Sequence, residues 1–352
     1  MTWISPSREP VDPGLQAGAR RAAKRLWPAA IPPLVLVLLV CAALVVPSKP
    51  YSRERFFHIE TGECLRSIED RLAKQGLIRL RGPLLAYGRL TGLDRRIRPG
   101  TYELSASQSP LAILKTLVAG DVVLRRVTIP EGFTTEAILT RLSSELGVAI
   151  EQLRAAAADT AWIRSLGLAA PGLEGYLFPE TFLFDPQTTA REALAEMVAV
   201  GEARFDEGRR LRASELGLSR HEILTLASII ELEAADEVER RRVSAVYRNR
   251  LLRGLLLQAD PTAAYAAGRI GQRLSLEDLA IDSPYNTYLY PGLPPGPICS
   301  PGLASIDAAL WPLEGCDDLY FVSRGDGTHA FSRTLEEHNQ ARGGLEKARQ
   351  GP

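Results

Sequence analysis

A single long uncharged segment, residues 26–46 (LWPAAIPPLVLVLLVCAALVV), divides the chain and limits how it can fold. Its length of about 21 residues gives about 30 Å of helix, the thickness of a membrane's hydrocarbon core. Basic residues within 20–25 precede it, which predicts a cytoplasmic N-terminus and export of everything after Ser48. The sequence therefore predicts a cytoplasmic tail at 1–25, one transmembrane helix at 26–46 and an exported remainder.

An alternative interpretation of this segment is a cleaved signal peptide. Prolines at its start leave only 34–46 strongly apolar, a length typical of the central region of a signal peptide. The residues that follow, Val45, Val46 and Pro47, do not form a small-x-small cleavage site. We therefore favour an uncleaved anchor and interpret Cys41 as an apolar residue of the span.

Composition indicates a globular chain that does not bind nucleic acid. The 352 residues are 45% hydrophobic and 24% charged, enough for two or three folded units. The 42 basic residues balance the 42 acidic ones, so no nucleic acid partner is predicted. Three cysteines, Cys64, Cys299 and Cys316, would be exported, an odd number that does not make a disulfide framework. Whether Cys299 and Cys316 pair is left open.

The exported part begins with a duplicated segment. The sequence of 57–77 (FHIETGECLRSIEDRLAKQGL) recurs at 127–147 (VTIPEGFTTEAILTRLSSELG). Each copy predicts a strand, a tight turn at a glycine and an amphipathic helix. Between the copies, 100–104 alternates like a strand, and Ser109 with a following proline caps a helix that Gly120 ends. Such units suit either a binding module or a scaffold, and both remain open.

Beyond Gly172 the pattern is mainly helical, and one acidic residue lies where a helix should be apolar. At 100° per residue, Glu231 shares a face with Leu224, Ala227 and Ser228. Burial disfavours a charged carboxylate, so we expect Glu231 to be biased toward protonation and able to act as a general acid. Glu233 turns toward other acids and is interpreted as an ordinary solvated side chain.

Three further elements are predicted after this helix. Asp236 and Glu239 form a capping-box pair that starts a second helix, which ends near Gly254. The segment 319–332 alternates on both sides of a Gly-Asp-Gly turn and predicts a β-hairpin. Thr334 then begins a last helix.

Several chemistries are excluded by missing motifs. The histidines, His58, His221, His329 and His338, are too scattered for a metal site. The sequence has no G-x-S-x-G motif, no phosphate-binding loop and no dinucleotide fingerprint. We therefore predict no metal and no cofactor.

Aromatic and amide side chains accompany the candidate acid in three short segments. Sugar rings offer C–H faces to aromatics and hydroxyl or acetamido groups to Asn, Gln and Asp, so this combination suits a carbohydrate site. Taken one at a time, a Tyr or Phe of this kind is more often a core residue, and Asp260 before a proline also suits a turn. One segment contains Glu174, Tyr176 and Phe178; the predicted substrate-binding residues from the other two are Gln258, Asp260, Tyr285, Asn286 and Tyr288.

The ordered motifs ASIIELEA, VYRNRL, LQADPT, YNTY, GLPPGPI and GTHAF resemble the catalytic domain of the endolytic murein transglycosylases, the YceG-like family. RPGTYEL, TIPEG and LEGYLFPETF resemble the segments that precede it. The resemblance implies an α+β fold: an N-terminal transmembrane helix, a LysM-like α+β module at 51–122, and a mainly helical catalytic domain with a β-hairpin at 123–348. It places a second LysM-like strand-helix unit within 123–150. It also implies a single-pass inner-membrane protein whose catalytic domain faces peptidoglycan.

By resemblance, the reaction is endolytic cleavage of MurNAc–GlcNAc bonds, which processes or terminates nascent glycan strands. The resemblance assigns Glu231 the catalytic role: it protonates the glycosidic oxygen, then takes the proton of the muramic C6 hydroxyl, which closes a 1,6-anhydro ring. Glu231 would act alone, without Glu233. Leu232 and Ala234 differ from the family pattern, which often has Lys and Thr there, and this leaves an altered activity open. Peptidoglycan synthases are the expected partners. The alternative is a membrane-anchored, non-catalytic peptidoglycan-binding or scaffold protein.

Overall fold

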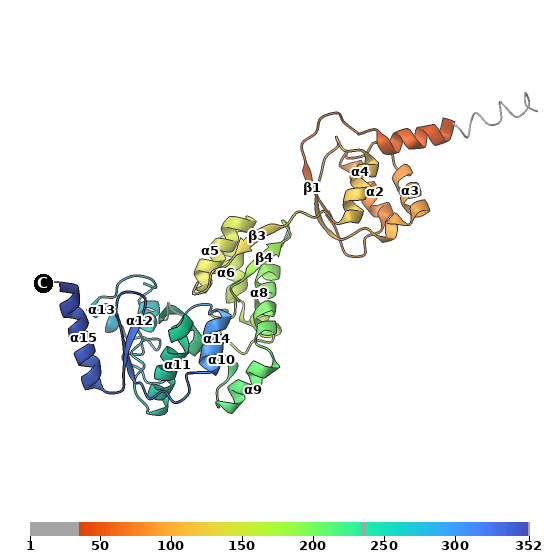
Figure 1. Ribbon diagram of the computed structural model, residues 1–352. Helices are drawn as coiled ribbons and strands as arrows, with labels where there is room; N and C mark the ends of the chain where they lie inside the picture. Colours follow the sequence, from red (N-terminus) through yellow and green to blue (C-terminus); the bar gives the residue numbers. More distant parts are fainter. Residues whose placement is uncertain (1–34, 234–236, 351–352) are drawn as a thin grey trace, which may run out of the picture. The chain divides into compact units, whose positions relative to one another are not determined.

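The chain forms two compact units, Met1–Leu124 and Arg125–Pro352 (Figure 1). The structure is a computed structural model that describes residues 35–233 and 237–350. The predicted tail and the first part of the predicted transmembrane segment lie outside the described residues, whereas 35–45 form a helix. Within the described ranges, no helix combines the length and the apolar composition that crossing a membrane requires.

The first unit is a two-stranded antiparallel sheet covered by short helices. Strand β1 pairs with β2 so that Phe57 stands opposite Tyr102, and both side chains are buried. The predicted cap of α4 is confirmed, since Ser109 accepts a hydrogen bond from the Ala112 N–H and Gly120 ends the helix at φ +76°. The elements are β1 (Arg55–Ile59), α2 (Leu65–Lys74), α3 (Pro83–Thr91), a 3-10 turn (Leu93–Arg95), β2 (Gly100–Leu104) and α4 (Pro110–Ala119).

The second unit opens with the second copy of the duplicated segment. The prediction of a strand, a turn and a helix in each copy is confirmed, and the turn glycines Gly62 and Gly132 have φ values of +82° and +78°. The two copies lie in separate sheets, because β3 pairs antiparallel with β4 and not with β1. The elements are β3 (Arg125–Thr128), α5 (Thr135–Leu146), α6 (Ile150–Ala158), α7 (Thr160–Ser165), β4 (Thr181–Phe184), α8 (Ala190–Arg204) and α9 (Glu207–Glu215).

Helix α10 (Arg220–Glu233) is the central helix of the second unit. Its residues 223–230 are all buried, so apolar burial on every side, rather than one stripe, holds it. It packs against α14 and α11. The elements that follow it are α11 (Glu237–Leu252), α12 (Asp260–Ala266), α13 (Leu276–Leu279), α14 (Leu303–Leu310), β5 (Tyr320–Ser323), β6 (His329–Ser332) and α15 (Leu335–Gln350).

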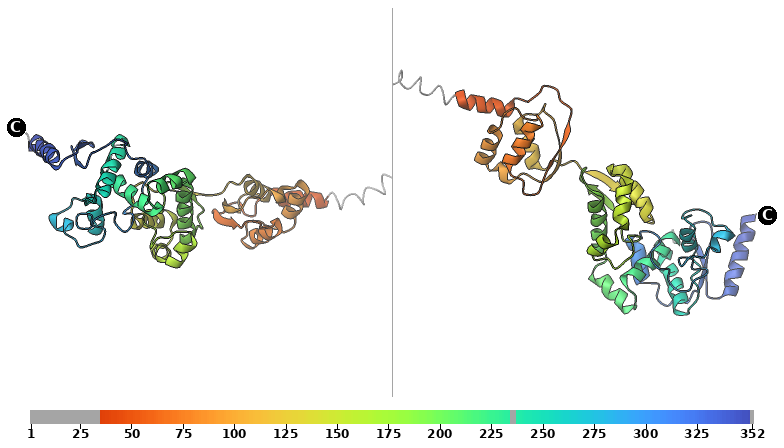
Figure 2. Two further views of the ribbon diagram at one scale, coloured as in Figure 1. Left: turned by 90° about the horizontal axis from the view of Figure 1, so that it is seen from below. Right: turned by 180° about the vertical axis from the view of Figure 1, so that it is seen from behind.

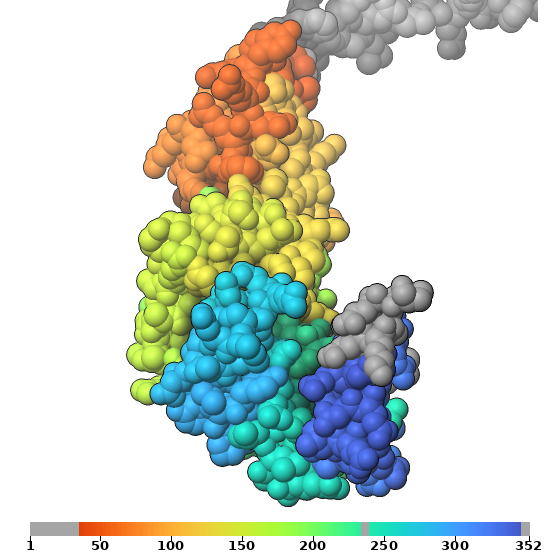
Figure 3. Space-filling model, turned by 90° about the vertical axis from the view of Figure 1, so that its left-hand side faces the viewer, coloured from red at the N-terminus to blue at the C-terminus, as the bar shows by residue number. Residues whose placement is uncertain are grey.

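The C-terminal hairpin and last helix form as predicted. Strands β5 and β6 pair antiparallel, and Thr334 caps α15 by accepting the Glu337 N–H while the Glu337 carboxylate accepts the Thr334 N–H. Helix α15 contacts both strands, and β5 contacts α11. Figure 2 shows α15, in dark blue, at the C-terminal end of the chain. In the space-filling view, the dark blue surface of this C-terminal segment borders the teal surface that begins near residue 250 (Figure 3).

The structure also bears on the predicted capping box and on the two cysteines whose pairing was left open. Glu239, one half of the predicted capping box, accepts from the backbone N–H of His329 and pairs with His329 Nδ1 at 2.8 Å through its carboxylate. Asp236, the other half of that predicted box, lies outside the described residues. Cys299 and Cys316 are both free thiols, and buried Cys299 points at the backbone oxygen of Ser228. As a whole the fold is mixed, mainly helical with small antiparallel sheets.

Candidate active site

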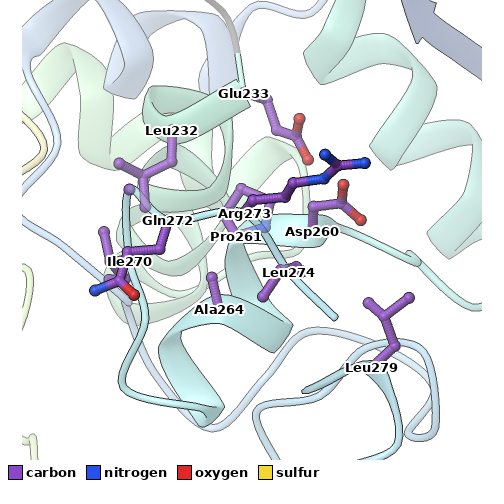
Figure 4. A pocket seen from close by; sticks show the side chains of 11 residues that line it. Leu232, Glu233, Asp260, Pro261, Ala264, Ile270, Gln272, Arg273, Leu274 and Leu279 are labelled. Atoms are coloured by element: carbon purple, nitrogen blue, oxygen red, sulfur yellow. The ribbon is translucent and has the colours of Figure 1, made fainter. Parts of the chain in front are cut away.

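Two cavities meet at the end of α10. The first, of about 540 Å³, is lined by residues of α10, α12 and the segment 270–274. The second, of about 550 Å³, is lined by residues of α11, the β5–β6 hairpin and α15. Glu233 and Asp260 line both cavities, and we call this shared part of the two walls their junction. Figure 4 shows the two carboxylates on one side of the first cavity, with the guanidinium of Arg273 directed toward them.

Glu233 is the last residue of α10, and its environment differs from the solvated one expected. The hydroxyl of Tyr247, from α11, donates to Glu233 Oε1 at 2.8 Å. Burial raises the pKa of Glu233 to about 7, the charge of Asp260 adds to the rise, and the Tyr247 hydrogen bond opposes it. The interpretation of Glu233 as an ordinary solvated acid is therefore wrong. It is a shielded carboxyl that titrates near neutral pH and faces open cavities.

Asp260 and its neighbours form the wall beyond Glu233. The hydroxyl of Tyr288 donates to Asp260 Oδ1 at 2.5 Å, and Arg250 Nη2 donates to Gln258 Oε1 at 2.7 Å. Gln258 holds a positive φ of 50°, an uncommon backbone conformation for a residue other than glycine. Three predicted substrate-binding residues, Gln258, Asp260 and Tyr288, thus line the second cavity together.

Glu231, the acid selected from the sequence, has a different environment. Its side chain is 9% exposed and lines neither of these cavities. Its Oε2 accepts the Gly302 N–H at 2.9 Å, and Arg240 Nη2 lies 3.9 Å from its Oε1. Arg240 is thus a nearby cation that sequence reasoning did not identify. In this position Glu231 joins α10 to the start of α14.

A further acid that sequence reasoning did not single out, Glu131, lies in the turn between β3 and α5. Its carboxylate lies against Gly302, where a Cβ would overlap it. Burial raises the pKa of Glu131, the charge of Glu231 adds to this effect, and Arg240 opposes it. Glu131, Glu231 and Gly302 therefore bring three segments of the chain together beside the end of α10. Only the TIPEG motif, which contains Glu131, gave a signal for it.

Two predicted substrate contacts are structural in this geometry. Asn286 is fully buried, and its Nδ2 donates to the backbone oxygens of Leu279 and Ile281. Its Oδ1 accepts the Tyr288 N–H at 3.1 Å, so Asn286 holds the loop that presents Tyr288. Tyr285 packs against Tyr265 with ring centroids 4.9 Å apart and lines neither cavity. Neither side chain lines the two cavities, and contact of these residues with sugar stays a prediction.

The three residues of the segment that contains Glu174 lie outside both cavities. Tyr176 and Phe178 are buried core residues. Glu174 accepts the Thr135 N–H at 2.9 Å, and burial raises its pKa to about 7. Glu174 lines neither cavity. We therefore interpret it as part of the packed interior rather than of the candidate active site.

The similarity to known proteins covers most of the chain. The model of the YceG-like family matches residues 57–343. A Bacillus subtilis protein named endolytic murein transglycosylase is 33% identical over 301 residues, 81% of this chain and 83% of that protein. One of the same name from Streptococcus pneumoniae is 32% identical over 80% of this chain, which spans only 56% of that longer protein. A solved YceG-like protein from Listeria monocytogenes superposes with a TM-score of 0.58 at 31% identity, covering 83% of this chain and 100% of that one. The chain belongs to the YceG-like family.

Proposed function

We propose that this protein is an endolytic peptidoglycan transglycosylase that cleaves MurNAc–GlcNAc bonds within glycan strands and leaves 1,6-anhydro-MurNAc ends. The observation that carries the proposal is the junction of two cavities at Glu233 and Asp260. A linear polymer bound along both cavities would present an internal bond to Glu233. The names of the bacterial relatives support peptidoglycan as the polymer.

In this proposal Glu233, and not Glu231, is the acid and base. A carboxyl whose pKa is about 7 is present in both forms at neutral pH. The protonated form donates to the glycosidic oxygen as the bond to the muramic C1 breaks. The resulting carboxylate takes the proton of the C6 hydroxyl, whose oxygen forms the new bond to C1. The internal hydroxyl replaces water, so proximity supplies part of the rate.

Asp260 supports a second candidate function. Glycoside hydrolases also use two carboxyl groups beside the glycosidic bond. One protonates the leaving group and the other activates a water. Asp260 lines both cavities with Glu233, but its Oδ1 is occupied by the Tyr288 hydroxyl. We therefore rank the hydrolase second. A non-catalytic scaffold is the third candidate, because burial alone also raises carboxyl pKa values.

The chemistry of the product ends tests these alternatives. Glycan strands are digested with the full-length protein, and the new ends are identified by mass spectrometry. Anhydro ends support the transglycosylase, and reducing ends at muramic acid replace it with the hydrolase. Absence of cleavage by the wild type, with binding retained, leaves the scaffold.

The location follows as part of the same proposal. The uncharged segment 26–46 and its basic flank support a single-pass anchor in the inner membrane with the catalytic unit outside the cytoplasm. Such an anchor would hold the groove near newly made strands and near peptidoglycan synthases. Protease accessibility of the second unit in intact spheroplasts measures this directly, and full protection of that unit would contradict it.

A further inference from the structure

We propose that the second cavity ends in a subsite for a carboxylate of the stem peptide on the glycan strand, formed by Arg250, His338 and Arg342. This inference rests on the proposed function, because it assumes that a peptide-bearing glycan occupies the groove. It goes further by assigning different roles to the two ends of the cavity: the glycosidic bond is cleaved at one end, and the stem peptide binds at the other.

The charges in the second cavity are separated by sign. The charge of Asp260 acts on Glu233, whereas the charges that act on His338 are those of Arg342 and Arg250. Tyr288 lines the same cavity and donates to Asp260; burial and the two acids raise the pKa of Tyr288, and Arg250 lowers it. A ligand that is neutral at the acid end and anionic at the other end would match this pattern.

Two buried polar atoms at the cationic end lack partners. Among the described residues, Arg250 Nε and His338 Nδ1 have no hydrogen-bond partner, although water does not reach them. A buried donor left unsatisfied costs about 1–3 kcal/mol, more if it is charged. Both side chains line the cavity. A polar ligand in the cavity that draws either side chain toward it would let these atoms complete their hydrogen bonds.

Repulsion between the positive charges of Arg250, His338 and Arg342 also favours the binding of an anion. Burial lowers the pKa of Arg250, and burial together with the charges of Arg342 and Arg250 lowers the pKa of His338. Arg250 uses Nη2 to hold Gln258, which leaves its Nε facing no partner in the described chain. Arg342 is exposed at the rim of α15. A carboxylate can accept from an arginine fork at two points, which a sugar hydroxyl cannot match.

A stem peptide is the carboxylate source that the proposed reaction brings to this place. Muramic acid carries its peptide on the sugar ring, so a muramyl residue bound at Glu233 holds a flexible, acidic chain within the same groove. The lining of the cavity also includes Tyr320 and Phe321, which can cover the apolar parts of sugar or peptide. The ring of Tyr320 lies against the Arg250 guanidinium and the His338 ring, so it belongs to the cationic end.

The test measures binding, so that it does not depend on turnover. The full-length Glu233→Gln protein is titrated with soluble peptide-bearing glycan oligomers and with the same oligomers after an amidase has removed the peptides. We expect the peptide to tighten binding, and Arg342→Gln in that background to weaken peptide-bearing oligomers about tenfold while peptide-free oligomers change less than about twofold. Arg250→Lys, which keeps the charge and loses the fork, should weaken the same oligomers by a smaller factor. Arg333→Gln, an exposed arginine outside the cavity, is the matched control.

Three results would overturn the subsite. These are equal affinity for the two oligomers, an equal loss on both oligomers in Arg342→Gln, and a loss in Arg333→Gln as large as that in Arg342→Gln. Failure of the proposed function looks different: the wild type would then leave both substrates uncut, while the difference in affinity between the oligomers would still be measured.

Discussion

The hydroxyl of Tyr247 donates to Oε1 of Glu233 at 2.8 Å, and this hydrogen bond limits how far burial raises the pKa of Glu233. Burial and the charge of Asp260 raise the pKa of the carboxyl, whereas the Tyr247 donor stabilises the charged form and lowers it. The balance leaves a pKa of about 7. A residue that must give a proton and then take one needs this balance, because neither form can dominate.

Replacement of the acid should abolish turnover without unfolding the protein. We expect Glu233→Gln to lower kcat by a factor of about 10²–10⁴, the usual contribution of a general acid. Glu231→Gln is the matched variant two residues away, and it should keep turnover within about threefold, since its amide oxygen can still accept the Gly302 N–H. Initial rates on glycan strands, with circular dichroism as the folding control, decide between them. The reverse pattern would return the acid role to Glu231.

The rate should depend on pH through Glu233. As pH rises through about 7, Glu233 loses its proton and can no longer protonate the leaving oxygen, so kcat should fall. Tyr247→Phe removes a donor that favours the charged form, and the descending limb should therefore move to higher pH. Tyr288→Phe, which loses a bond to Asp260 instead, should move it less. An unchanged limb in Tyr247→Phe would show that another group controls it.

Stability should also fall as pH rises. The pKa values of Glu174 and Glu233 are raised from 4.5 to about 7, so the folded state binds more protons than the unfolded state between these values. The free energy of unfolding is then highest below pH 4.5 for these groups and decreases through pH 7, by up to about 3 kcal/mol for each. Urea denaturation at pH 5.5 and 8 measures this. Glu174→Gln should flatten the dependence, whereas the exposed Glu151→Gln should leave it intact.

Two glycines with the same backbone conformation allow a matched test of packing. Gly175 and Gly167 have φ values of +78° and +81°, so alanine carries a similar backbone cost of about 1–2 kcal/mol at either site. A Cβ at Gly175 would overlap the ring of Pro297, while a Cβ at Gly167 meets nothing within 4 Å. We expect Gly175→Ala to lose about 1–3 kcal/mol more than Gly167→Ala. Equal losses of stability in thermal denaturation would mean that the loop containing Pro297 moves at no cost to accommodate the added Cβ.

Elements with local signals were predictable. The cap of α4 at Ser109, the cap of α15 at Thr334 and the hairpin around Gly325 and Gly327 each depend on residues a few positions apart. The duplicated strand-turn-helix units also follow from local pattern. Sequence could not place the two copies in separate sheets, because strand pairing depends on the distant strands β2 and β4.

The site was harder to predict because distant segments build it. Periodicity correctly placed Glu231 on the inner face of α10, where its carboxylate accepts the Gly302 N–H and its side chain is 9% exposed. Glu233 was misread because Tyr247 returns from α11 to cover it, and a helical projection of α10 alone contains no such neighbour. Asn286 was the right residue type in the right loop, but its amide serves the backbone of that loop.

The junction of two cavities at one carboxyl has a consequence for inhibitor design. Each cavity, at about 540 and 550 Å³, is of the size that holds a drug-sized molecule. Weak fragments found separately for the two sides could be joined across Glu233 by a short linker, which would raise the effective concentration of the second fragment to about the millimolar range or above. A linked compound would occupy both cavities at once. Resistance would then require substitutions in the lining of each cavity.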